Sequence, residues 1–185
     1  MAKRLFWKNY MASEDVGSML VHGRFYNDAD EQAEIFDGAL VTIGDLEDHA
    51  FYAGVKDLNV RKIKFAEADT DEVAIVDIVE RPHGDIMDVN YREGIKTAGM
   101  TAIAGLPVRV RILAKFDSFN IGAGNISGEP VVGEYLIPEA ATGLWVPSAT
   151  KVEGKTNVKV EAKNALTEGT IDTDVKYLCT VAALA

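Results

Sequence analysis

Short runs of β-forming residues recur along this chain, and each run is closed by residues that favour turns. Residues 39–43, 73–79, 108–113 and 158–161 are the clearest runs, with Gly, Asp, Asn or Pro between them. Aliphatic and β-branched runs of this length, bounded by turn residues, are typical of strands. No linker-like segment divides the 185 residues. The pattern therefore predicts a mainly β fold, a single-domain β-barrel or β-sandwich with long loops and little helix.

Three segments make this prediction specific. Residues 73–79 are too apolar for a half-exposed strand and indicate a central one. Residues 108–113 alternate, which places Val108, Val110 and Ile112 on one face and Arg109, Arg111 and Leu113 on the other. Asp37-Gly38 lies between apolar segments and predicts a tight turn.

Residues 1–22 differ from the rest of the chain and suggest an N-terminal arm or edge element, followed by a β-rich domain over residues 23–185. The segment carries Phe6, Trp7 and Tyr10, which require a hydrophobic surface to pack against. That surface can belong to the same domain or to a neighbouring subunit, and both alternatives stay open. We take these three aromatic residues as the candidate partner-binding residues.

The charge balance excludes some classes of partner. The chain has 29 acidic and 19 basic residues, a net charge of −10, and its basic clusters are small. Phosphate contacts need clustered Lys and Arg, so we expect no nucleic-acid binding.

The longest apolar stretch, residues 97–108, contains Gly99, Gly105 and Pro107 and is too short for a membrane span. The N-terminus lacks the apolar core of a secretory signal, which predicts folding in a cytosol.

The reactive side chains form no catalytic pattern. The single cysteine, Cys179, lies in an apolar strand-like run and is expected to be a buried small hydrophobe. His22, His49 and His83 are far apart and lack zinc-site spacing. We therefore expect no catalytic residue, no cofactor and no metal site.

Two further patterns resemble binding motifs superficially. The Gly-rich residues 120–128 lack the Lys-Ser/Thr ending and the following helix of a phosphate-binding loop, which favours a β-turn or a mobile surface loop. The acidic run that starts at Asp28 has Ala33 and Ala39 where a calcium-binding EF-hand loop needs Gly and Glu. A solvated acidic turn is the expected structure there.

The order of several landmarks resembles a known class of proteins. Residues 18–25, the segment Asp-Gly-Ala-Leu-Val-Thr-Ile at 37–43, residues 108–112 and the closing residues 175–181 together look like the decoration, cement or minor head proteins of tailed bacteriophages. The resemblance implies a non-enzymatic homo-oligomer on the capsid exterior of the virion, assembled in the host cytoplasm. Its implied partners are the major capsid protein and copies of itself. The resemblance assigns no binding residues.

Two other functions remain open. A β-rich module that binds a carbohydrate or small ligand would present a row of exposed aromatic side chains, for which the candidates are Phe116, Phe119, Tyr135 and Trp145. The alternative for these four residues is packing in the core. A hydrolase with dispersed carboxylates would need a pocket in which acidic side chains converge.

Overall fold

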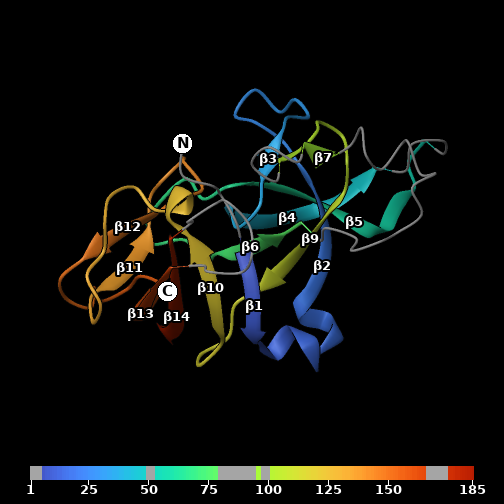
Figure 1. Ribbon diagram of the computed structural model, residues 1–185. Helices are drawn as coiled ribbons and strands as arrows, with labels where there is room; N and C mark the ends of the chain where they lie inside the picture. The colour runs from blue at the N-terminus through green and yellow to red at the C-terminus, as the bar shows by residue number, and fades with distance from the viewer. Residues whose placement is uncertain (1–5, 49–52, 79–94, 97–100, 166–174) are drawn as a thin grey trace.

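The protein is mainly β, as the sequence predicted, and it combines a closed barrel with a larger open sheet (Figure 1). The computed structural model describes residues 6–48, 53–78, 95–96, 101–165 and 175–185. Within these residues the helical segments are three short 3-10 turns: η1 (Ala12–Glu14), η2 (Gly17–Met19) and η3 (Ala123–Asn125). None of them has the length and apolar character needed to cross a membrane.

Five strands close the barrel in the order β2-β5-β4-β6-β9. β2 and β5 run parallel, and the other neighbouring pairs are antiparallel. Gly23 lies inside the barrel, where an added Cβ would stand 2.7 Å from Ile63 Cγ2, so glycine is required for this close approach. The strands are β2 (Leu20–Phe25), β4 (Leu40–Asp48), β5 (Lys56–Phe65), β6 (Ala74–Asp77) and β9 (Val108–Ile112).

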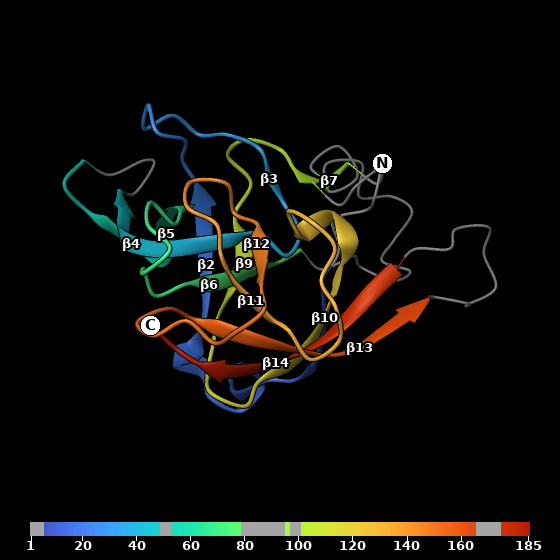
Figure 2. The ribbon, with the colours of Figure 1, turned by 90° about the vertical axis from the view of Figure 1, so that its left-hand side faces the viewer.

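A six-stranded antiparallel sheet packs against the barrel, and Figure 2 shows β13 and β14 passing below the barrel strands β4 and β6. In the described residues its order is β1-β10-β14-β13-β11-β12. Its strands are β1 (Phe6–Tyr10), β10 (Ser118–Gly122), β11 (Tyr135–Pro138), β12 (Trp145–Ser148), β13 (Asn157–Ala165) and β14 (Val175–Ala183). A small third sheet contains β3 (Ile35–Phe36), β7 (Ile95–Lys96) and β8 (Thr101–Ala102).

Two hydrophobic cores result, one inside the barrel and one between the barrel and the six-stranded sheet. β4 and β6 contribute to both, because side chains alternate along a strand. Val41 and Ala74 point into the barrel core, whereas Leu40 and Ile75 point into the core beneath the sheet. The sequence prediction of a central strand at residues 73–79 is confirmed for the described part, since β6 is buried throughout.

The predicted alternation in β9 is also observed. Val108 and Val110 are buried in the barrel core, and Ile112 packs against it. On the opposite face Leu113 enters the core beneath the sheet and Arg111 is 1% exposed.

The N-terminal segment is part of the two-layer structure. β1 is an edge strand that pairs with β10, with Phe6 opposite Ile121 and Tyr10 opposite Ser118. The buried Phe6 packs 5.6 Å, centroid to centroid, from Phe119. Residues 6–22 therefore contain an edge element of the sheet followed by two 3-10 turns.

Candidate interaction surfaces

The structure places the three predicted partner-binding aromatics differently. Phe6 is 7% exposed and lies in the core beneath the six-stranded sheet, so its packing surface belongs to its own domain. The side chain of Trp7 lies outside the described residues. Tyr10 is 70% exposed at the end of β1. Partner binding by these residues stays a prediction, and Tyr10 is the member whose ring the structure describes as accessible.

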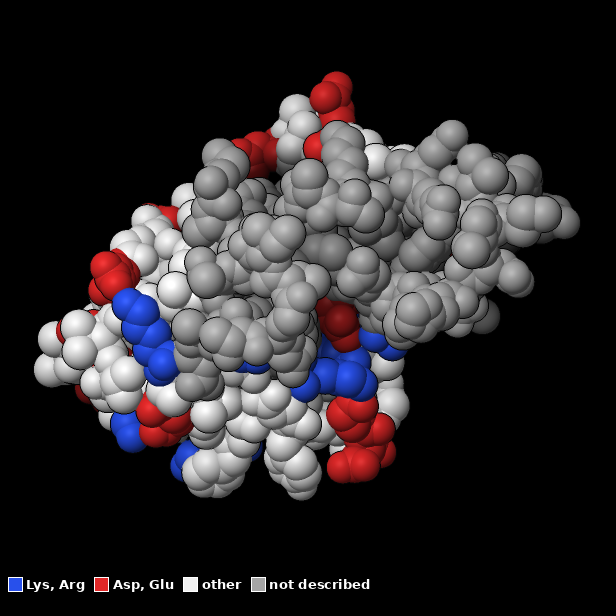
Figure 3. All heavy atoms as spheres, in the orientation of Figure 1, with Lys and Arg blue, Asp and Glu red and all other residues white. Residues whose placement is uncertain are grey.

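Tyr10 has a neighbour that the sequence did not group with it. Phe116 is 69% exposed and lies in the turn that leads into β10, whose first residue, Ser118, pairs with Tyr10. The ammonium of Lys115 stands 5.1 Å from the centroid of the Phe116 ring. We call Tyr10, Lys115 and Phe116 the aromatic knob. The end of β1 and this turn lie together at the lower end of Figure 1, and the same edge of Figure 3 is largely uncharged.

Phe116 is held in a backbone conformation that does not suit a phenylalanine. Its φ is +74°, at the third position of a turn closed by a hydrogen bond from Asp117 N to Ala114 O. Glycine is favoured at such a position, and a bulky residue is strained there by about 1–3 kcal/mol. The protein therefore tolerates strain at the point where it exposes this aromatic ring.

Asp117 fixes the base of the knob. This residue is 2% exposed, and its carboxylate accepts hydrogen bonds from the backbone N–H of Ala114 at 2.9 Å and of Ala12 at 2.8 Å. Phe116 N–H also donates to Val181 O at 2.9 Å. Since the turn, the start of η1 and β14 are joined here, the two exposed rings project from a rigid base. Rigid aromatic side chains lose little conformational entropy on binding and are common anchors of interfaces.

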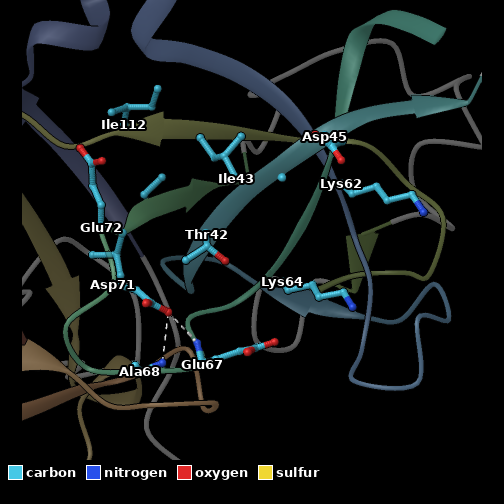
Figure 4. Close-up of a pocket in the computed structure, with 13 residues that line it drawn as sticks. Thr42, Ile43, Asp45, Lys62, Lys64, Glu67, Ala68, Asp71, Glu72 and Ile112 are labelled. Carbon is cyan, nitrogen blue, oxygen red and sulfur yellow. Dashed lines mark hydrogen bonds between the residues drawn. The ribbon is translucent and has the colours of Figure 1, made fainter.

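A groove of about 820 Å³ lies beside the barrel, between β4, β5 and the loop that joins β5 to β6 (Figure 4). Ile43, Ala74 and Ile112 supply apolar lining. Glu72 stands at one end of the groove, away from Lys62 and Lys64 at the other end.

The two ends of this groove differ in how their charges are satisfied. Lys62 and Lys64 both pair with Asp30, at 3.7 and 3.2 Å. Within the described part of the chain, the carboxylates of Glu67 and Glu72 form no ion pair. Asp71 is used internally, because its carboxylate accepts hydrogen bonds from the backbone N–H of Glu67 and Ala68. Glu72 therefore offers a carboxylate to an external cation at the end of the groove away from the two lysines.

The face of the six-stranded sheet that points away from the barrel is a second broad surface. Leu178 and Thr180 alternate along β14 with the buried residues Tyr177, Cys179 and Val181, so they point outward. By the same alternation Tyr135, Ile137 and Lys159 face outward, and all of these outward side chains are partly exposed. We call this surface the outer sheet face.

The charge of this sheet is opposite in sign to that of the whole chain. Its six strands contain four lysines, Lys8, Lys159, Lys163 and Lys176, and one acidic residue, Glu161. The whole chain has a net charge of −10. The acidic residues are therefore concentrated in other parts of the molecule, including the loops at 27–34 and 67–72.

The other sequence motifs have structural roles where the structure describes them. The Gly-rich residues 120–128 are not a mobile surface loop: they form the end of β10 and η3, and the fully buried Asn125 donates from Nδ2 to the backbone oxygen of Asp37 at 2.7 Å.

Cys179 is buried, as predicted, and burial raises the pKa of its thiol. Within the described residues, no group of three or more His, Cys, Asp or Glu is placed to hold a metal ion. His22 is exposed, and His49 and His83 lie outside the described residues.

The aromatic row considered for a carbohydrate-binding module does not form. Phe119 and Trp145 are fully buried in the core beneath the six-stranded sheet, and Tyr135 is partly exposed. Phe116, at 69%, is the one member of the four that is mostly exposed. Core packing therefore explains Phe119 and Trp145.

Sequence reasoning missed the buried charged residues, two of which, Arg111 and Asp37, hold the N-terminal segment. Arg111 donates from Nε to Asp77 at 2.6 Å and from Nη1 to Ser13 at 3.0 Å, and it also pairs with Glu14. It thereby ties the N-terminal segment to the barrel. The arginine was visible in the alternating pattern, but a pattern of alternation does not say whether the second face of a strand is covered.

Asp37 is the second missed residue. Its carboxylate accepts hydrogen bonds from the N–H of Phe6 at 2.7 Å and of Ile78 at 2.8 Å, so it joins β1 to the end of β6. Desolvation by burial, together with the nearby carboxylate of Asp77, raises the pKa of Asp37 to about 8. The predicted turn at Asp37-Gly38 is present, with Gly38 at φ +71°, but the aspartate also serves as a tertiary contact.

Comparison with known proteins gives no relative. The chain matches no protein-family model, no curated protein and no solved structure. Its function has to be inferred from its own surfaces.

Proposed function

We propose that the protein is a non-enzymatic structural subunit that binds the outside of a bacteriophage capsid and stabilises contacts between capsid subunits. The observation that carries the proposal is the outer sheet face, which has partly exposed apolar side chains and lysines in a chain with a net charge of −10. A continuous sheet face of this kind suits a broad protein surface. Lys159 pairs with Glu161 at 3.1 Å in an exposed ion pair, which a partner's carboxylate can join or replace. The order of sequence landmarks, which resembles phage decoration proteins, supports the same role.

The distribution of acidic residues supports an exterior location on the virion. Packaged DNA would repel acidic loops such as residues 27–34 and 67–72, whereas the capsid exterior imposes no such repulsion. The partners under this proposal are the major capsid protein and further copies of the chain, with assembly in the host cytoplasm. The protein would require no cofactor.

Co-sedimentation with phage heads that lack the protein tests the proposal. We expect saturable binding of the purified chain, and binding several-fold weaker for Lys159→Glu, because a reversed charge on the outer sheet face weakens association with an acidic partner surface. Lys151→Glu is the matched control, because this exposed lysine lies in the loop after β12. Free protein that stays at the top of the gradient at every concentration would overturn the proposal.

One observation favours a second function, a module that binds a small ligand. The groove beside the barrel has a volume of about 820 Å³ and a partly apolar lining, within the usual range for ligand sites. Isothermal titration with neutral and acidic oligosaccharides would test this function. Heat of binding that disappears in Thr42→Trp, which would fill the groove, would support it.

A further inference from the structure

We propose that the aromatic knob of one copy of this protein docks into the groove of a second copy, so that copies associate head to tail. The proposal deepens the structural role given above and rests on it only in taking the protein to act as an assembled subunit. The contact itself involves this chain alone. Purified protein can therefore test it without any capsid, and failure of this contact would be a separate result from failure of capsid binding.

The knob and the groove match in chemical character. The knob offers two rings, Tyr10 and Phe116, that are 70% and 69% exposed, beside the ammonium of Lys115. The groove offers an apolar lining that includes Ile43 and Ile112. An exposed aromatic pair gains most by entering an apolar recess from which water can be displaced.

The charges of the two surfaces are also complementary. Within the described residues Lys115 has no carboxylate partner, and its ammonium lies over the Phe116 ring. Glu67 and Glu72 line the groove and likewise make no ion pair with described residues. A knob inserted with Lys115 toward Glu72 brings the ammonium to that carboxylate and keeps Lys115 away from Lys62 and Lys64, which lie at the other end (Figure 4).

The two surfaces lie on different sides of the molecule. In Figure 2 the turn before β10 is at the lower end, whereas the loop between β5 and β6 is at the left-hand side. A knob cannot reach the groove of its own copy, so the contact is between copies. Because the two contacting surfaces differ, the association is heterologous and gives rings or open chains instead of a closed two-fold dimer.

The size of the knob sets the strength of the contact. Two aromatic side chains bury roughly 300–500 Å², less than the ~800 Å² that each partner contributes to a standard interface. The association is therefore weak in dilute solution and becomes significant where many copies are held close together. The strained backbone of Phe116 fits this role, since glycine at that turn would relieve the strain but remove the ring.

Sedimentation velocity of the full chain from about 1 µM to about 1 mM, the range of weak specific association, tests the proposal. We expect the weight-average sedimentation coefficient to rise with concentration. Phe116→Gly should weaken association about thirty-fold or more, the effect of removing a binding hot spot, while its melting temperature stays the same or rises. Val132→Gly, which removes an exposed side chain from another loop, is the matched control and should associate as the parent does.

A mixing experiment identifies the second surface. The Glu67→Lys/Glu72→Lys variant should lose most association, whereas the control Asp28→Lys/Glu31→Lys, with the same change of charge in a different acidic loop, should retain it. Phe116→Gly retains its groove and Glu67→Lys/Glu72→Lys retains its knob. When these two variants are mixed, the knob of the second should therefore enter the groove of the first, and the mixture should associate although neither variant does so alone. Adding Lys115→Glu to the groove variant should restore attraction between copies, because both charges are then exchanged.

The contrary results are equally clear. A protein that remains monomeric to about 1 mM, or association unchanged by Phe116→Gly, would overturn the proposal. Association that is lost in Phe116→Gly but unchanged in Glu67→Lys/Glu72→Lys would also overturn it, because the knob would then dock elsewhere.

Discussion

The core beneath the six-stranded sheet and the wall of the barrel share the strands β4 and β6, but different kinds of contact hold them: apolar packing in the first and ion pairs in the second. Beneath the sheet, apolar side chains such as Leu136, Phe119 and Trp145 are fully buried. The wall of the barrel instead carries ion pairs: the buried pair of Arg111 with Asp77, on the face that points away from the barrel core, and the partly buried pair of Arg24 with Glu47. Apolar burial is non-directional, whereas a buried ion pair requires one arrangement of its partners.

This difference indicates how the two layers are held together. Buried apolar side chains hold the sheet against the barrel, and this packing does not require one exact arrangement of its partners. The N-terminal segment is fixed to the barrel by Asp37 and Arg111, whose partners are specific atoms on β1, η1 and β6. Substitutions and pH should therefore affect the two regions differently.

The largest expected effect is a dependence of stability on pH that originates at Asp37. Its pKa is raised from 3.8 to about 8, so the native state holds a proton that the unfolded chain releases. Stability is then fully present below about pH 4 and falls as pH rises toward 8, by up to about 1.4 kcal/mol per pH unit. Urea unfolding across this range measures the slope.

The Asp37→Asn variant should remove that slope, because asparagine does not titrate. Asp28→Asn, an exposed position, is the control and should keep it. A parent protein whose stability is constant or rises between pH 4 and pH 8 would contradict the role given to Asp37.

Arg111→Ala should have the next largest effect, a loss of about 3–5 kcal/mol in the free energy of unfolding, because it leaves Asp77 buried without its partner. Arg61→Ala is the control, since Arg61 is partly exposed and donates one hydrogen bond to Gly44 O. Chemical unfolding followed by fluorescence gives both values. Equal losses for the two variants would show that the buried ion pair does not stabilise the joint between η1 and the barrel.

In the core beneath the sheet, Leu136→Ala should cost about 2–5 kcal/mol, because it removes a fully buried side chain and leaves a cavity. Ile137→Ala changes the adjacent, partly exposed side chain and should cost clearly less. Unlike the Asp37 effect, the loss in Leu136→Ala should not change with pH. A loss of stability in Leu136→Ala that varied with pH would contradict the statement that apolar packing alone holds this core.

Lys8→Ala should have the smallest effect, below about 1 kcal/mol. Lys8 pairs with Glu14 at 2.6 Å, and its hydrogen bond is the first cause that lowers the pKa of Glu14, but the pair is exposed. Thermal melts at low and high salt measure the contribution, which should shrink as salt rises. A loss as large as that of Arg111→Ala would mean that the exposed pair holds the segment.

Much of the fold follows from local pattern. The alternation of β9, the buried β6 and the burial of Cys179 were all predicted correctly, because the period of a strand fixes which side chains share a face. The sequence predicted the candidate interaction surface less completely than the fold. Tyr10 was among the predicted residues, but Phe116 was considered only in a different group, and its partner Lys115 was not considered.

What the sequence determined by itself was the mainly β class, several strands such as β6 and β9 with their two faces, and the acidic balance of the chain, since these depend on neighbouring residues and composition. The tertiary structure alone decided that Phe6 is buried while Tyr10 is exposed, that Arg111 and Asp37 lie inside, and that the turn carrying Phe116 leads into the strand that pairs with Tyr10. Each of these depends on contacts between segments about 30 to 110 residues apart. A local pattern states which face of a strand is apolar, but only the packing of distant strands determines what covers that face.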